Sequence, residues 1–124
     1  MKAVVKKMIS LEIEDTLENF WPHDIHNFGT WVKLMIGPDN EVGAEYFDIF
    51  VCTPDWLKTE CLKHGFVWER HILIIDEYDL NNITAKICWR IDRCSGNTWS
   101  ETSLNISKYA AWEFEDVEVL SQKI

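Results

Sequence analysis

The clearest pattern of apolar and polar positions lies between residues 28 and 57. Every second residue from 28 to 36 belongs to the set Phe, Thr, Val, Leu and Ile, while the residues between them are mixed. This period of two predicts a strand with one face on a core. Residues 45–53 are rich in aromatic and β-branched side chains, which favour a second strand. The Gly-Pro-Asp-Asn sequence at 37–40 predicts a turn, so the whole stretch predicts an antiparallel hairpin.

Helical signals follow the hairpin. The Thr-Pro-Asp sequence at 53–55 is typical of a helix N-terminus and predicts a short helix over residues 54–63, which Gly65 would end. Residues 80–94 carry four aliphatic side chains and one cysteine on a single stripe at helical spacing, which predicts a second helix. A Thr-x-x-Glu capping box begins the segment 98–109 and predicts a third helix there.

In three further segments the pattern of apolar and polar residues predicts strands. Residues 1–13 form a long first strand, and residues 112–117 a short last one. Residues 66–75 return as a strand whose end, 72–75, is apolar on both faces. Such an end indicates either a central strand covered on both sides or a strand end sealed by a helix.

These elements predict one α+β domain over residues 1–124. We expect a single antiparallel sheet of about four or five strands, a short helix after the central hairpin, and two C-terminal helices packed on one face of the sheet. The end of the chain, about 118–124, is expected to fray.

Composition and charge narrow the function classes. The chain of 124 residues has a formal net charge of -9, which disfavours binding to nucleic acid or to an anionic membrane. Seven tryptophans are many for this size. The four cysteines have no framework spacing, and no export signal or membrane span is evident, so we expect reduced thiols and a cytoplasmic protein.

Candidate chemistry is sparse. His23 and His26 share one loop and His71 begins a strand, so a small hydrolase or nuclease that uses these histidines with nearby carboxylates stays an alternative. The Cys61-x-x-His64 spacing is one half of a zinc pattern and leaves open a scaffold or metal-storage role. We find no phosphate loop or nucleophile motif, and we expect no catalytic residue, cofactor or metal.

Acidic residues gather in two runs, near residues 12–18 and 113–118. These runs are either two solvated charge clusters or a negative face with tryptophan anchors nearby, as tight protein interfaces use. On the second interpretation, the candidate partner-binding residues are Glu12, Asp15, Trp89, Glu113, Glu115 and Asp116.

Several short motifs resemble immunity protein family 8, one class of immunity proteins from bacterial polymorphic-toxin and contact-dependent inhibition systems. The similarity runs from about residue 28 to residue 116. The matching motifs are Phe28-Gly29-x-Trp31, Ile36-Gly37-Pro38, Phe47-Asp48-x-Phe50-Val51-Cys52-Thr53-Pro54-x-Trp56-Leu57, Arg70-His71, Glu77-Tyr78-Asp79, Gly96-x-Thr98-Trp99 and Trp112-Glu113-Phe114-Glu115-Asp116.

The resemblance implies a small cytoplasmic α+β protein that is not an enzyme. Its partner would be the C-terminal domain of a cognate toxin, often a basic nuclease, which it would neutralise by forming a stoichiometric complex. The resemblance brings no catalytic, cofactor-binding or metal-binding residues, and it leaves the toxin and the oligomeric state open.

Overall fold

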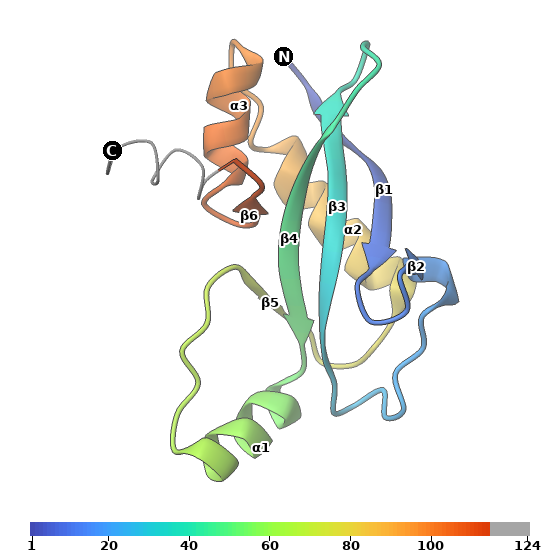
Figure 1. Cartoon of the computed structure of the whole chain (residues 1–124), viewed down its shortest axis with the longest axis vertical. Coiled ribbons are helices and arrows are strands. Elements are labelled where there is room, and N and C mark those ends of the chain that lie inside the picture. Colours follow the sequence, from blue (N-terminus) through green and yellow to red (C-terminus); the bar gives the residue numbers. More distant parts are fainter. Residues whose placement is uncertain (115–124) are drawn as a thin grey trace.

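The computed structural model describes residues 1–114, and they form one α+β fold (Figure 1). The strands are β1 (Ala3–Ser10), β2 (Asp15–Thr16), β3 (Gly29–Pro38), β4 (Glu45–Cys52), β5 (Ile72–Ile74) and β6 (Ala111–Trp112). The helices are the 3₁₀ helix η1 (Leu17–Asn19) and the α-helices α1 (Pro54–His64), α2 (Leu80–Asp92) and α3 (Trp99–Ile106). The expected fold class, α+β with an antiparallel sheet and two C-terminal helices, is confirmed, except that one of the strand pairs, β4 with β5, is parallel.

The sheet is built outward from the β3–β4 hairpin. Its strand order is β2-β1-β3-β4-β5, and β6 pairs with β4 beside β5. The register of the hairpin runs from Gly29 opposite Cys52 to Ile36 opposite Glu45, as the alternating pattern predicts. On the other side of β3, β1 pairs antiparallel with it and contains a bulge between Val5 and Lys7.

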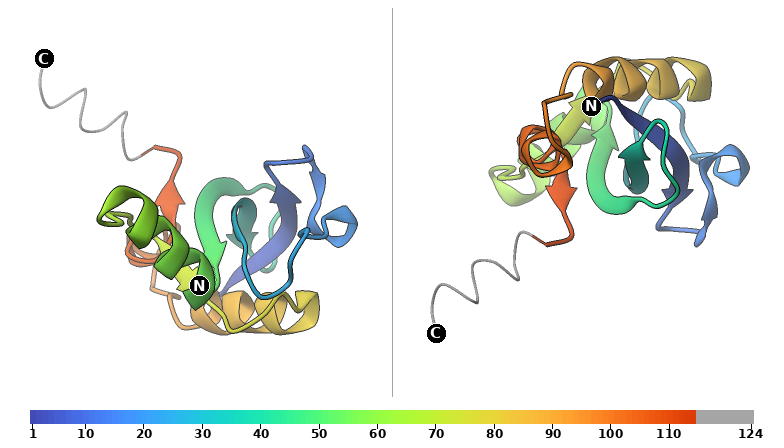
Figure 2. Two further views of the ribbon diagram at one scale, coloured as in Figure 1. Left: turned by 90° about the horizontal axis from the view of Figure 1, so that it is seen from below. Right: turned by 90° about the horizontal axis from the view of Figure 1, so that it is seen from above.

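The core lies between one face of this sheet and the two C-terminal helices (Figure 2). The residues of β3 that share the parity of Val32 are buried, and so are Phe47, Ile49 and Val51, which face them on β4. The apolar stripe of α2 packs against the same face, as do the buried positions of α3. The central side chains are Val32, Leu34, Ile36, Phe47, Ile49, Val51, Ile83, Ile87, Ile91 and Ile106.

The strand expected over residues 66–75 is much shorter, because β5 has only three residues. It pairs parallel with β4 at the edge of the sheet, with Leu73 opposite Val51. The expectation of a central strand covered on both faces is therefore wrong, and Ile74 is 53% exposed. Leu73 and Ile75 turn towards the core, so the run of four apolar residues reflects an edge strand whose alternate residues take different environments.

The first and last strands are also shorter than predicted. Ser10 ends β1, because the following turn contains Glu14 at a positive φ of 54° and reverses the chain into β2. The last strand is β6 alone, and the remainder of the strand predicted over 112–117, like the expected fraying of 118–124, falls largely outside the described residues.

One carboxylate connects three elements at the upper end of the core. Glu45 of β4 accepts hydrogen bonds from the indole Nε1 atoms of Trp99 in α3, at 2.9 Å, and Trp112 in β6, at 2.7 Å. The hydroxyl of Ser103 in α3 donates to the same carboxylate at 3.4 Å. Hydrogen bonds to a charged acceptor are stronger than neutral ones, so Glu45 fixes how α3 and β6 dock on β4.

We expect Glu45→Gln to lower the free energy of unfolding by about 1–3 kcal/mol, since the new NH₂ group would oppose one of the two indole N–H donors. Urea denaturation followed by circular dichroism measures this loss. Glu41→Gln in the exposed β3–β4 turn is the matched control and should leave the midpoint unchanged. Equal midpoints for both variants would contradict the role given to Glu45.

Candidate protein-binding surface

One face of the sheet is left open. Figure 1 looks onto this face, and Figure 2 shows α2 on the opposite side. Within residues 1–114 no helix crosses the open face, and only the first turn of α1 reaches its lower end. Successive side chains of a strand point to opposite faces of the sheet, so every second side chain of β3 and β4 lies on this face. These residues are Trp31, Lys33, Met35, Tyr46, Asp48 and Phe50.

Three aromatic rings form a row along the lower half of the open face. The ring centroids of Trp31 and Phe50 are 5.2 Å apart, and those of Phe50 and Trp56 are 4.8 Å apart. Trp56 lies in α1, which Thr53 positions: the Thr53 hydroxyl accepts from the Trp56 backbone N–H and caps the helix. Phe50 is only 6% exposed between the half-buried rings of Trp31 and Trp56, so the exposed part of the row comes from the two tryptophans.

Gly29 allows this row to form. A Cβ atom at Gly29 would lie 2.5 Å from Cε2 of Trp56 and 2.7 Å from Cζ of Phe50. Such distances are shorter than any van der Waals contact, so a side chain here would displace both rings. The glycine at the start of β3 is therefore explained by the close approach of Trp56.

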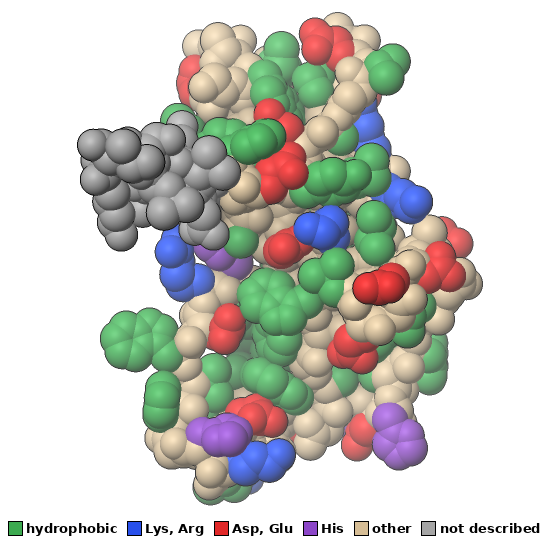
Figure 3. All heavy atoms as spheres, in the orientation of Figure 1, with side chains coloured by type: hydrophobic (Ala, Val, Ile, Leu, Met, Phe, Trp, Pro, Cys, Tyr) green, Lys and Arg blue, Asp and Glu red, His purple; other side chains and the backbone are tan. Residues whose placement is uncertain are grey.

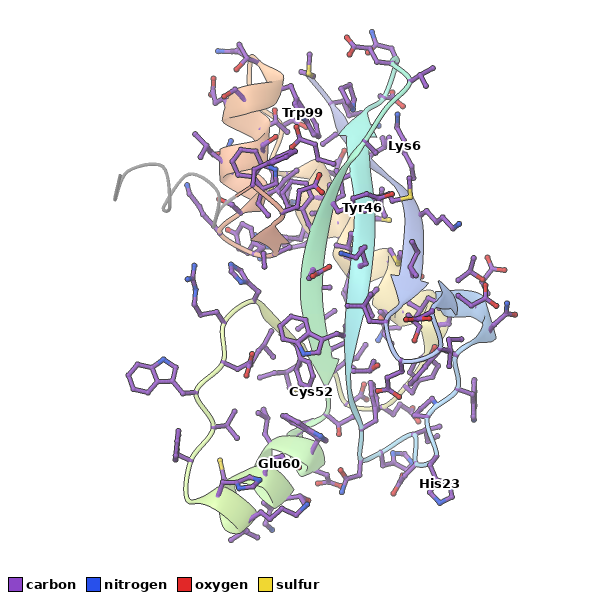
Figure 4. All side chains as sticks on the ribbon, viewed as in Figure 1. Lys6, His23, Tyr46, Cys52, Glu60 and Trp99 are labelled. Atoms are coloured by element: carbon purple, nitrogen blue, oxygen red, sulfur yellow. The ribbon has the colours of Figure 1, made fainter. Side chains whose placement is uncertain are left out.

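The upper half of the open face is polar but locally neutral. Lys33 forms an ion pair with Asp48 directly opposite it, with 3.1 Å between Nζ and Oδ1. The same ammonium group lies 5.3 Å from the centre of the Tyr46 ring. Tyr46 is 37% exposed and extends from β4 on this face (Figure 4). An aromatic ring with an amphipathic tip in this position is typical of a binding anchor.

Acidic residues border the open face on two sides. Glu12 and Asp15 are exposed beside the β1–β2 edge, and Glu113 follows β6 at the other edge. The Glu113 carboxylate accepts from the backbone N–H of Tyr46 at 3.0 Å, which places it directly beside the tyrosine. Figure 3 shows acidic side chains on both sides of this face, with hydrophobic side chains between them.

Asp15 is held in its charged form. The side-chain amide of Asn19 donates to it at 2.9 Å and the backbone N–H of Thr16 at 2.7 Å. These two hydrogen bonds, with a smaller contribution from Lys7, lower the pKa of the Asp15 carboxyl below its ordinary value. Asp15 therefore keeps its negative charge at any pH near neutrality.

Trp89 lies apart from these acidic residues. It belongs to α2, opposite the stripe that packs on the sheet, and is 48% exposed. Its ring contacts two cations, the guanidinium groups of Arg90 at 4.7 Å and Arg93 at 4.1 Å. The structure therefore brings Glu12, Asp15 and Glu113 to the borders of one face and leaves Trp89 on another, while Glu115 and Asp116 lie outside the described residues.

Sequence reasoning missed the residues between the acidic borders. Trp31 and Tyr46 are the side chains of the open face that are best placed to anchor a partner. The alternating pattern could have indicated this face. The side chains of the hairpin that do not point into the core must face either solvent or a partner. It also missed the segment after α1, where Phe66 and Trp68 are 64% and 86% exposed.

Comparison with known proteins gives one match. A family model described as immunity protein 8 matches residues 5–117 of the 124-residue chain. This chain belongs to the immunity protein 8 family. No curated protein and no solved structure matches it. Among the described helices of the immunity protein, none is long and apolar enough to cross a membrane.

The histidines of the immunity protein do not form a shared site. His23 (Figure 4) and His26 are exposed in the loop that precedes β3, whereas His71 comes immediately before the edge strand β5. The Nε2 atom of His71 is already 2.9 Å from the carbonyl oxygen of Ser107. Within residues 1–114 no three His, Cys, Asp or Glu side chains are grouped so that they could hold a metal ion.

All four cysteines are free thiols, as the sequence predicts. Cys52 is fully buried at the end of β4, and burial raises the pKa of its thiol to about 11. Burial also raises the pKa of the Cys94 thiol, despite the nearby charges of Arg90 and Lys108. Cys61, in contrast, is exposed on α1.

We expect iodoacetamide at pH 8 to alkylate Cys61 in the folded protein and to leave Cys52 unmodified. The thiolate is the reactive form, and at this pH the buried thiol of Cys52 stays protonated as well as inaccessible. Peptide mass spectrometry after timed quenching measures the two rates. Unfolding in urea should make the alkylation rates of Cys61 and Cys52 similar. Equal rates in the absence of urea would contradict the burial of Cys52.

Proposed function

We propose that this immunity protein binds a cognate toxin domain through the open face of its sheet and neutralises it in a stoichiometric complex, without catalysing a reaction. The observation that carries the proposal is the sheet face that no described helix covers, on which Tyr46 is exposed and Trp31 and Trp56 are half-buried, in a member of an immunity protein family. A monomer gains nothing in stability by exposing such a surface, whereas an interface uses it as an anchor.

The toxin is, on this proposal, a nuclease that acts in the cytoplasm. A nuclease needs a cationic cleft to hold phosphates, and a chain with a net charge of -9 would be attracted to it. Glu12, Asp15 and Glu113 border the aromatic face, and Glu115 and Asp116 follow in sequence. Charges at the border of an interface accelerate association and select the partner, while the central aromatic residues hold the complex together.

Co-expression tests the proposal. The first step is to establish whether the open reading frame that precedes this gene encodes a large protein with a toxic C-terminal domain; that domain is then the partner to use. We expect the immunity protein to restore growth of cells that produce this domain, and the two chains to purify as a one-to-one complex. Protection by amounts of immunity protein far below those of the toxin would instead indicate catalysis and overturn the proposal.

A further inference from the structure

A second surface lies on the side of the molecule that bears α2. A groove of about 600 Å³ runs between the outer edge of β5, the exposed side of α2 and the end of α3. Its walls include Ile72 and Ile74 of β5 and the rings of Trp89 and Tyr109. This groove does not belong to the open sheet face, and the inference drawn from it does not rest on the proposed function.

The groove is cationic although the chain is strongly acidic. Lys86 and Arg90 of α2 and Lys108 after α3 line it together with His71, against the single carboxylate of Asp76. Among the ion pairs of the described residues, none involves Lys86, Arg90 or Lys108. The positive charges are therefore available to an anionic ligand.

Arg90 packs against two aromatic rings. Its guanidinium group lies 4.7 Å from the ring of Trp89 and 4.4 Å from the ring of Tyr109, and it approaches the Tyr109 hydroxyl at 3.5 Å. Two aromatic rings thus hold the cation in place at the wall of the groove. A guanidinium group fixed in this way is suited to a planar carboxylate, because less side-chain freedom is lost when it binds.

The edge of β5 supplies backbone groups to the same groove. The His71 carbonyl accepts from the Phe50 N–H at 2.9 Å, and the Ile75 N–H donates to the Cys52 carbonyl at 2.9 Å. The backbone groups of His71 and Ile75 therefore point towards β4. In a parallel pair, the residues between them, Ile72 and Ile74, direct their N–H and C=O groups away from β4. An edge of this kind can accept a further strand.

We propose that the groove binds an extended acidic peptide segment of a partner protein, which adds a strand to the edge of β5 and places its carboxylates on Lys86, Arg90 and Lys108. The free strand edge supplies backbone hydrogen bonds, and the cations supply selectivity for acidic side chains. A mononucleotide is less suited to the site, because Arg90 already occupies the faces of the two rings on which a base would stack.

An octapeptide of alternating glutamate and valine, with blocked ends, is the probe, and an octapeptide of alternating lysine and valine is its control. Titration into the ¹⁵N-labelled protein should shift the backbone amide signals of Ile72 and Ile74 in a saturable way with the acidic peptide only. Unchanged signals for these two amides would overturn the proposal. Inorganic phosphate that shifts them as strongly would indicate a small-anion site and would overturn it too.

Charge variants separate the groove from general electrostatics. The double variant Lys86→Glu, Lys108→Glu should weaken binding of the acidic peptide at least tenfold. The matched control Lys58→Glu, Lys63→Glu changes two exposed cations on α1 and should retain the affinity. Equal losses in both variants, or a dimer of this chain in which β5 is already paired, would overturn the proposal. Ile74→Pro should also abolish the binding, because it removes an outward N–H group and leaves the bonds of His71 and Ile75 to β4 in place.

Discussion

Replacing Tyr46 by alanine should weaken binding of the cognate toxin domain about 30-fold or more while the immunity protein stays folded. Truncation of a central anchor costs about 2 kcal/mol or more, which corresponds to this loss of affinity. Tyr46 qualifies because it is 37% exposed, lies on the open face, and is flanked by Lys33 and by the Glu113 carboxylate. Calorimetric titration of the purified toxin domain measures the change.

The control for this prediction is Leu104→Ala. Leu104 is also exposed, at 53%, but it lies on α3 beside the sheet rather than on its open face. We expect this variant to bind like the wild type. If Leu104→Ala weakens the complex and Tyr46→Ala does not, the toxin binds at the α3 side and the open face is the wrong surface.

Phe47→Ala should have the largest effect on stability, a loss of about 3–5 kcal/mol in the free energy of unfolding. The Phe47 side chain is 0% exposed and stacks on Trp112, with ring centroids 6.5 Å apart and an angle of 14° between the planes. Its removal leaves a cavity where β4, β6 and α3 meet. Since small domains are stable by only about 5–15 kcal/mol, this variant should lose a large share of its native population.

Urea denaturation measures the effect, and Phe47→Leu is the control. Leucine fills more of the space, so its cost should be clearly smaller than that of alanine. Protection of toxin-producing cells should follow stability and be lower for Phe47→Ala than for Phe47→Leu. A similar unfolding midpoint for wild type and Phe47→Ala would contradict the packing described for this core.

The elements with strong local periodicity were the predictable part of the fold. The hairpin of β3 and β4 follows from a strict period of two, and α2 from a stripe at helical spacing, because in both cases burial on one side determines the pattern. The length of β5 was not predictable in this way. The four consecutive apolar residues at 72–75 indicated either a covered central strand or a strand end sealed by a helix, and the sequence does not show that β5 pairs with β4 at the edge of the sheet.

The candidate surface was predictable only in part. Acidic residues near Glu12 and Glu113 are far apart in sequence, and their position at opposite edges of one face depends on the strand order, which a single sequence does not contain. The helical spacing did indicate that Trp89 points away from the core. It did not indicate that two arginines would cover its ring or that the surface around it would be cationic.

Two later strands complete the outer edge of β4: β5 pairs with it in parallel and the much later β6 pairs with it in antiparallel orientation. A nascent chain that has just emerged from the ribosome with β1 to β4 in place still lacks both of these partners. Assembly of the native sheet must therefore wait until Ala111 and Trp112 of β6 have been synthesised.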